Sequence, residues 1–109
     1  MKPVAWLGDS RLCLREFPDD ARRVAGHELA LVQAGREPSR WKPMPAVGLG
    51  VSELRVSTGD AFRVIYVAKF AEAVYVLHAF QKKSRRTAQP DIELARRRYR
   101  AVIEERRKR

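Results

Sequence analysis

The chain has 109 residues, of which 45% are hydrophobic, so a wholly disordered polymer is excluded and one domain spanning residues 1–109 is expected. It carries 23 Lys and Arg against 13 Asp and Glu, a formal net charge of +10, which is the outlying feature of its composition. Cys13 is the only cysteine, which excludes an internal disulfide and a cysteine-rich zinc site.

The first third of the chain predicts one strand followed by two helices. Residues 3–7 (PVAWL) form the expected strand. Ser10 is the expected cap of a short helix, and Asp19 or Asp20 is the expected cap of a longer one. The longer helix should end at Gly35, where a left-handed terminal residue is common. Its apolar face has helical spacing and consists of Ala21, Ala25, Leu29 and Val32.

Residues 36–50 predict a long loop. They contain three of the six prolines and two of the six glycines, and these residue types interrupt both helices and strands. We expect two large apolar side chains, Trp41 and Met44, to hold this loop against the core.

Three strands are predicted next, over residues 51–57, 61–68 and 73–80, because these segments are rich in β-branched and aromatic residues. Turns at residues 57–60 and 70–72 indicate sequential hairpins, hence an antiparallel meander. The second and third strands are almost continuously apolar, which is typical of a sheet that is covered on both faces.

A last helix is predicted from Pro90, which is well suited to the first turn of a helix. Its apolar residues again recur at helical spacing: Ile92, Ala95, Tyr99 and Val102. The whole order (strand, two helices, three-strand meander, helix) predicts an α+β domain with helices packed on a small antiparallel sheet.

The positive charge is concentrated in the second half of the chain. Residues 1–54 hold 8 basic and 7 acidic residues, whereas residues 55–109 hold 15 basic and 6 acidic residues. This asymmetry predicts a polyanionic partner, either a nucleic acid or an acidic protein. The alternative is a merely solvated, arginine-rich surface. No apolar run approaches the ~20 residues of a membrane span, and no secretory signal is evident, so we expect a cytoplasmic protein with no membrane partner.

Several runs of residues resemble one protein family. They are residues 53–55 (ELR), 62–66 (FRVIY), 68–70 (AKF), 73–83 (AVYVLHAFQKK) and 91–96 (DIELAR). Together they resemble the RelE/ParE superfamily of toxins, in particular its HigB-type, phage Gp49-like branch. The resemblance covers about the whole chain, with specific motifs in residues 53–98 and only a general pattern in the N-terminal helices.

The resemblance implies a RelE-like fold and the toxin of a type II toxin–antitoxin pair. Its implied activity is that of an endoribonuclease that cleaves mRNA on the ribosome without metal or other cofactor. Its implied partners are mRNA, the ribosome and a cognate antitoxin, often with a helix-turn-helix domain. Two alternatives stay open, because a fold does not determine a function. One is a non-catalytic inhibitor like the gyrase poisons of the same fold, and the other is a phage-derived nucleic-acid-binding accessory.

Three cations are the main catalytic candidates. Arg55 lies in mid-strand, on the side opposite Leu54 and Val56, so its side chain should lie on a polar face of the sheet. Arg63 interrupts an apolar strand and therefore needs a carboxylate, the surface or a phosphate; the alternatives for a carboxylate are Glu53 and Asp60. By resemblance, Arg63 matches the arginine that stabilises the cleavage transition state. Lys82 matches the cation that follows the last family strand.

The remaining candidates lie in or just after the last strand. His78 could transfer protons, although its place inside the strand favours a structural, hydrogen-bonded role. By resemblance Lys83 belongs to the same motif as Lys82, while Arg85 and Arg86 are expected to bind the RNA backbone away from the cut. Residues 84–90 lack the tyrosine or histidine that better-known family members carry there. The general base is therefore left open between His78 and a lysine with a lowered pKa.

Overall fold

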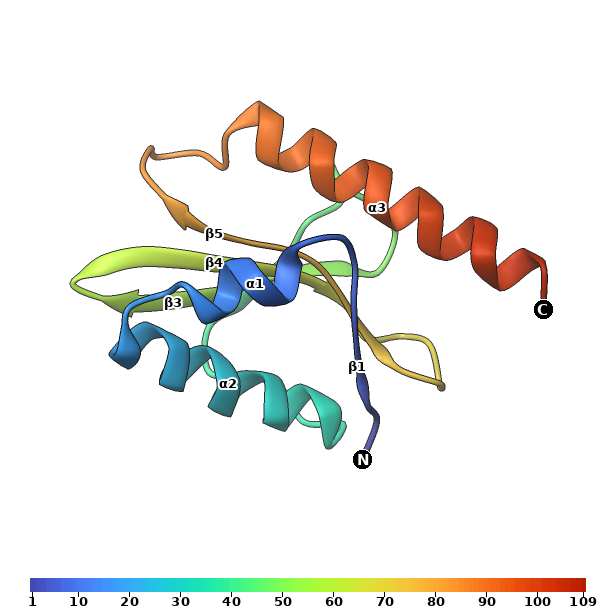
Figure 1. The fold of residues 1–109 in the computed structure, drawn as a ribbon, viewed down its shortest axis with the longest axis horizontal. Helices are drawn as coiled ribbons and strands as arrows, with labels where there is room; N and C mark the ends of the chain where they lie inside the picture. Colours follow the sequence, from blue (N-terminus) through green and yellow to red (C-terminus); the bar gives the residue numbers. More distant parts are fainter.

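The computed structural model describes residues 1–109, which form a five-stranded sheet and three helices (Figure 1). In chain order the elements are β1 (Val4–Trp6), α1 (Ser10–Arg15), α2 (Asp19–Gln33), β2 (Trp41–Pro43), β3 (Val51–Thr58), β4 (Asp60–Val67), β5 (Val74–Lys82) and α3 (Gln89–Arg107). The predicted α+β class is confirmed, and all seven predicted helices and strands occur in the predicted order, with β2 as an additional strand.

The sheet is mixed, with the strand order β1-β5-β4-β3-β2. The pairs β3–β4 and β4–β5 are antiparallel, as the meander predicts, and β2 is antiparallel to β3, but β1 pairs with β5 in parallel. The expectation of a purely antiparallel sheet is corrected in this respect. The expected loop 36–50 is also corrected, because residues 41–43 pair with β3 as an edge strand that ends at a proline. An edge tolerates proline, since one side of the strand needs no hydrogen-bond donor.

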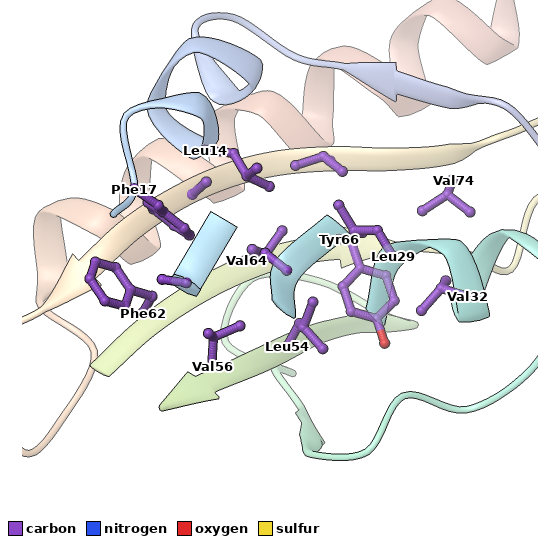
Figure 2. Packing of buried hydrophobic residues seen from close by; sticks show 14 residues of the cluster. Leu14, Phe17, Leu29, Val32, Leu54, Val56, Phe62, Val64, Tyr66 and Val74 are labelled. Carbon is purple, nitrogen blue, oxygen red and sulfur yellow. The ribbon is translucent and has the colours of Figure 1, made fainter. Parts of the chain in front are cut away.

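Helices cover both faces of the sheet (Figure 1). Helices α1 and α2 lie on one face and α3 lies on the other, with a separate hydrophobic core beneath each layer. Figure 2 shows the first core, where side chains of α1 and α2 meet those of β3, β4 and β5. The central strands are buried on both faces, which explains their almost unbroken apolar sequence.

Local signals at the helix ends are confirmed in part. Gly35 has a φ of 78°, and the amide of Arg36 donates to the carbonyl of Leu31, so α2 ends in the expected left-handed cap. The predicted N-terminal caps are wrong. The hydroxyl of Ser10 is buried and donates to the carbonyl of Val76, and Pro18 rather than an aspartate precedes the first turn of α2.

The loop after α2 is anchored differently from what the sequence suggests. Met44 is buried as expected, but Trp41 is 37% exposed at the sheet edge. Trp41 lies on β2, the outermost strand, which has a neighbouring strand on one side only. The prediction for Trp41 is therefore wrong.

The pairing of β5 with β4 is interrupted by one extra residue on β5, on the strand that packs against α3. His78 pairs with Ile65, while Val76 pairs with the next residue, Tyr66, so Leu77 has no partner on β4. The carbonyl of Leu77 accepts a hydrogen bond from Arg98 of α3 at 2.9 Å. This extra residue is a β-bulge, and it gives α3 a fixed contact with β5, the strand that precedes it in the chain.

Candidate functional site

Basic side chains gather on the α3 side of the sheet, near the end where β5 leads into the loop before α3. Arg55 of β3 lies directly opposite Arg63 of β4, and Lys42 of β2 lies opposite Glu53 of β3. Directly paired residues of antiparallel strands share one face. Lys82 joins them because it pairs with Ala61, two residues before Arg63 on the same strand. The strand register therefore assembles the three predicted catalytic cations.

An ion pair lies at the centre of this group. The side chain of Glu53 is 0% exposed and that of Arg63 is 6% exposed. Arg63 Nε lies 3.5 Å from Glu53 Oε1, and Arg63 Nη1 donates to the carbonyl of Phe62 at 2.9 Å. Of the two carboxylates that the sequence left open, Glu53 is thus the partner of Arg63. The hydrogen-bonding capacity of the pair is not fully used, because neither Arg63 Nε nor Glu53 Oε1 has a hydrogen-bond partner.

The same carboxylate reaches the loop that follows β5. The hydroxyl of Thr87 donates to Glu53 Oε2 at 2.7 Å. This loop, residues 83–88, carries three exposed cations: Lys83, Arg85 and Arg86. Glu53 consequently connects the cations of the sheet with those of the loop. We refer to Lys42, Arg55, Arg63 and Lys82 as the sheet cations, and to residues 83–88 as the basic loop.

The electrostatics of the sheet cations reflect their crowding. Burial lowers the pKa of Arg63, the carboxylate of Glu53 opposes this effect, and Arg55 and Arg40 add repulsion. Partial burial also lowers the pKa of Lys82, with a further contribution from the nearby charge of Arg63. A bound phosphate would relieve this repulsion, because it would place negative charge among cations that have only one carboxylate for compensation.

His78 lies beside this group but is held by other residues. Its Nε2 is 2.7 Å from Asp91 Oδ1, its ring stacks on Phe80 with centroids 4.8 Å apart, and the residue is only 7% exposed. Asp91 belongs to the first turn of α3, so the contact joins β5 to the start of that helix. This geometry favours the structural role for His78.

Two further basic residues were missed by the sequence analysis. Lys42 and Arg40 lie in the segment that was expected to be a loop, and the pairing of β2 with β3 brings them to the site. Arg40 Nη1 donates to the hydroxyl of Ser57 at 3.2 Å, next to Arg55 along β3. The only signal in the sequence was a basic residue on each side of Trp41, which is too common to identify a site.

The structure contains no group of three His, Cys, Asp or Glu side chains placed to hold a metal ion. None of its helices is both long enough and apolar enough to cross a membrane.

A change of Lys82 to glutamine is expected to stabilise the protein at neutral pH. The pKa of Lys82 is lowered in the folded protein. At pH values between this lowered pKa and the ordinary value of 10.5, the unfolded chain therefore binds more protons than the folded chain does. The free energy of unfolding of the wild type should therefore rise with pH through this interval. Denaturant titrations from pH 7 to 10.5 should show the advantage of Lys82→Gln shrinking as the pH rises. The matched control is Lys83→Gln in the exposed loop next to Lys82; an equal trend in both variants would contradict the crowding of Lys82.

The fold and the site define a small α+β protein with a cationic sheet face, suited to bind a polyanion. The chain belongs to the family described as Phage derived protein Gp49-like (DUF891), whose model matches residues 13–100. This family is part of the RelE/ParE-like toxin superfamily, and its members are often the toxins of toxin–antitoxin pairs. No curated protein matches the chain.

Proposed function

We propose that the protein is the toxin of a type II toxin–antitoxin pair, of the HigB-type branch, and that it cleaves mRNA on the ribosome without a metal ion. The observation that carries the proposal is the convergence of Arg55, Arg63 and Lys82 around one buried carboxylate on an otherwise basic face. Cations fixed in this way suit the negative charge that develops on a phosphate during strand cleavage.

Cleavage of this kind has three requirements. The ribose 2′-hydroxyl must lose a proton, the pentavalent phosphate must be stabilised, and the leaving 5′-oxygen must gain a proton. In our proposal Arg63 and Arg55 stabilise the phosphate. Fixed donors of this type typically contribute about 10²–10³ in rate each.

Lys82 is the proposed proton carrier. Its pKa is lowered by partial burial and by Arg63, so a larger fraction of its amine is neutral than for an ordinary lysine. None of the ion pairs in the structure includes Lys82, which leaves the amine available to RNA. His78 is the weaker candidate, because Asp91 occupies one ring nitrogen and Phe80 covers the ring.

The basic loop is the proposed contact for the RNA backbone. Lys83, Arg85 and Arg86 are exposed, and none of them forms an ion pair within the chain. Exposed cations at the edge of a binding site are the usual partners of phosphates outside the reacting position. A cognate antitoxin, of helix-turn-helix type in our proposal, would inhibit by covering Arg63 and Lys82.

Induced expression in bacteria is expected to arrest growth and to shorten transcripts, with cuts inside translated regions. Sequencing of transcript 5′ ends before and after induction tests this expectation. Growth arrest with intact transcripts would favour the non-catalytic inhibitor of the same fold. Unchanged growth and intact RNA, with soluble protein confirmed, would contradict a toxin of either kind.

A further inference from the structure

Glu53 is the one acidic side chain within the group of sheet cations, and it is completely buried. Carboxylates are rarely buried unless they are paired and hydrogen-bonded, because removing the charge from water is costly. A strand residue that served only packing would be better served by an apolar side chain. The position of Glu53 therefore requires an explanation in terms of what its two oxygens hold.

One oxygen holds the basic loop. Thr87 lies 34 residues along the chain from Glu53, and its hydroxyl donates to Oε2 at 2.7 Å. Within the basic loop, the other side-chain hydrogen bond is internal, from the hydroxyl of Ser84 to the carbonyl of Arg86. The contact between Thr87 and Glu53 is thus the side-chain hydrogen bond that ties this loop to the sheet.

The other oxygen faces the guanidinium of Arg63. The distance of 3.5 Å between Arg63 Nε and Glu53 Oε1 gives electrostatic attraction without a formed hydrogen bond. A carboxylate in this arrangement orients the guanidinium without saturating its donors. Nε is itself buried, and Nη1 donates to Phe62, whereas Nη2 has no hydrogen bond within the chain and is not buried in the same way, so Arg63 keeps this donor for a ligand.

We propose that Glu53 is a positioning residue that fixes the basic loop through Thr87 and orients Arg63, so that both present their cations to the same RNA strand. This inference rests on the proposed function, because it names how the site is held together for RNA. It differs from a plain counter-ion role, in which Glu53 would only neutralise charge and the loop would be ordered without it.

The first test measures the loop without any RNA. In Thr87→Val the hydroxyl is lost while the shape is kept, and trypsin should then cut after Lys83, Arg85 or Arg86 about tenfold faster, because a hydrogen bond to a charged group is lost. The matched control is Thr58→Val at the turn between β3 and β4, where the threonine hydroxyl has no hydrogen-bond partner. Equal cutting of the loop in both variants would overturn the tether.

The second test separates Arg63 from the loop. Glu53→Gln keeps an oxygen that accepts from Thr87 but removes the negative charge beside Arg63. We expect loop cutting as in the wild type, a single-turnover cleavage rate at saturating RNA about tenfold lower, and RNA binding that is equal or tighter. If Glu53 had only a structural role, its replacement would instead lower the cleavage rate and RNA binding together, in proportion to the unfolded fraction. A melting curve on each variant determines that fraction.

The two tests also distinguish this inference from the proposed function. If the wild type cuts no RNA, the proposed function is wrong, and so is the proposal that Glu53 orients Arg63 for RNA. The trypsin experiment still tests whether the contact between Thr87 and Glu53 holds the loop. If the wild type cuts RNA but Thr87→Val leaves the loop protected, the proposed function stands and the inference is wrong.

Discussion

Replacement of Arg63 by alanine is expected to slow single-turnover RNA cleavage by about 10²-fold or more, while RNA affinity changes far less. The reason is that a fixed guanidinium at the reacting phosphate meets negative charge that develops in the transition state. Loss of about 10²-fold corresponds to about 2.7 kcal/mol of transition-state stabilisation. Quench-flow cleavage at saturating RNA, with binding measured separately, gives the two effects independently.

The buried ion pair demands a control for stability. Arg63→Ala leaves Glu53 fully buried without its nearest cation, and breaking a buried pair in this way typically costs about 3–5 kcal/mol. The double variant Arg63→Ala with Glu53→Gln removes both charges and should recover part of that loss. If cleavage stays low in the double variant while its melting temperature recovers, Arg63 acts on RNA. If cleavage recovers together with stability, Arg63 is structural and the site assignment is wrong.

The fold could largely be predicted from the sequence, because its main signals are local. The spacing of Ala21, Ala25, Leu29 and Val32 marks the buried face of α2, and all four are buried. Gly35 marks the end of that helix for the steric reason that glycine tolerates a positive φ.

Long-range pairing could not be predicted in the same way. Nothing local states that residues 4–6 join β5 in parallel or that residues 41–43 pair with β3. A three-residue edge strand gains its hydrogen bonds only once its neighbour exists, so its own sequence carries little signal. This is also why Lys42 was missed.

The site was predictable as a set of residue types, and its internal contacts were not. Arg63 stands out in an apolar strand, and alternation along β3 places Arg55 and Glu53 on one face. The contact between Glu53 and Thr87 joins segments 34 residues apart, so only the tertiary structure reveals it. The contact of His78 with Asp91 depends in a similar way on where α3 begins.

The central claim is tested most directly by adding the purified protein to a reconstituted translation system with a defined mRNA and mapping the 5′ ends of the products. The account predicts cuts within the translated region of ribosome-bound mRNA in the presence of the wild type, and about 10²-fold slower cutting with Arg63→Ala. Cuts of equal rate without ribosomes would remove only the ribosome dependence. Intact mRNA with folded wild-type protein, or cutting by folded Arg63→Ala at the wild-type rate, would contradict the account.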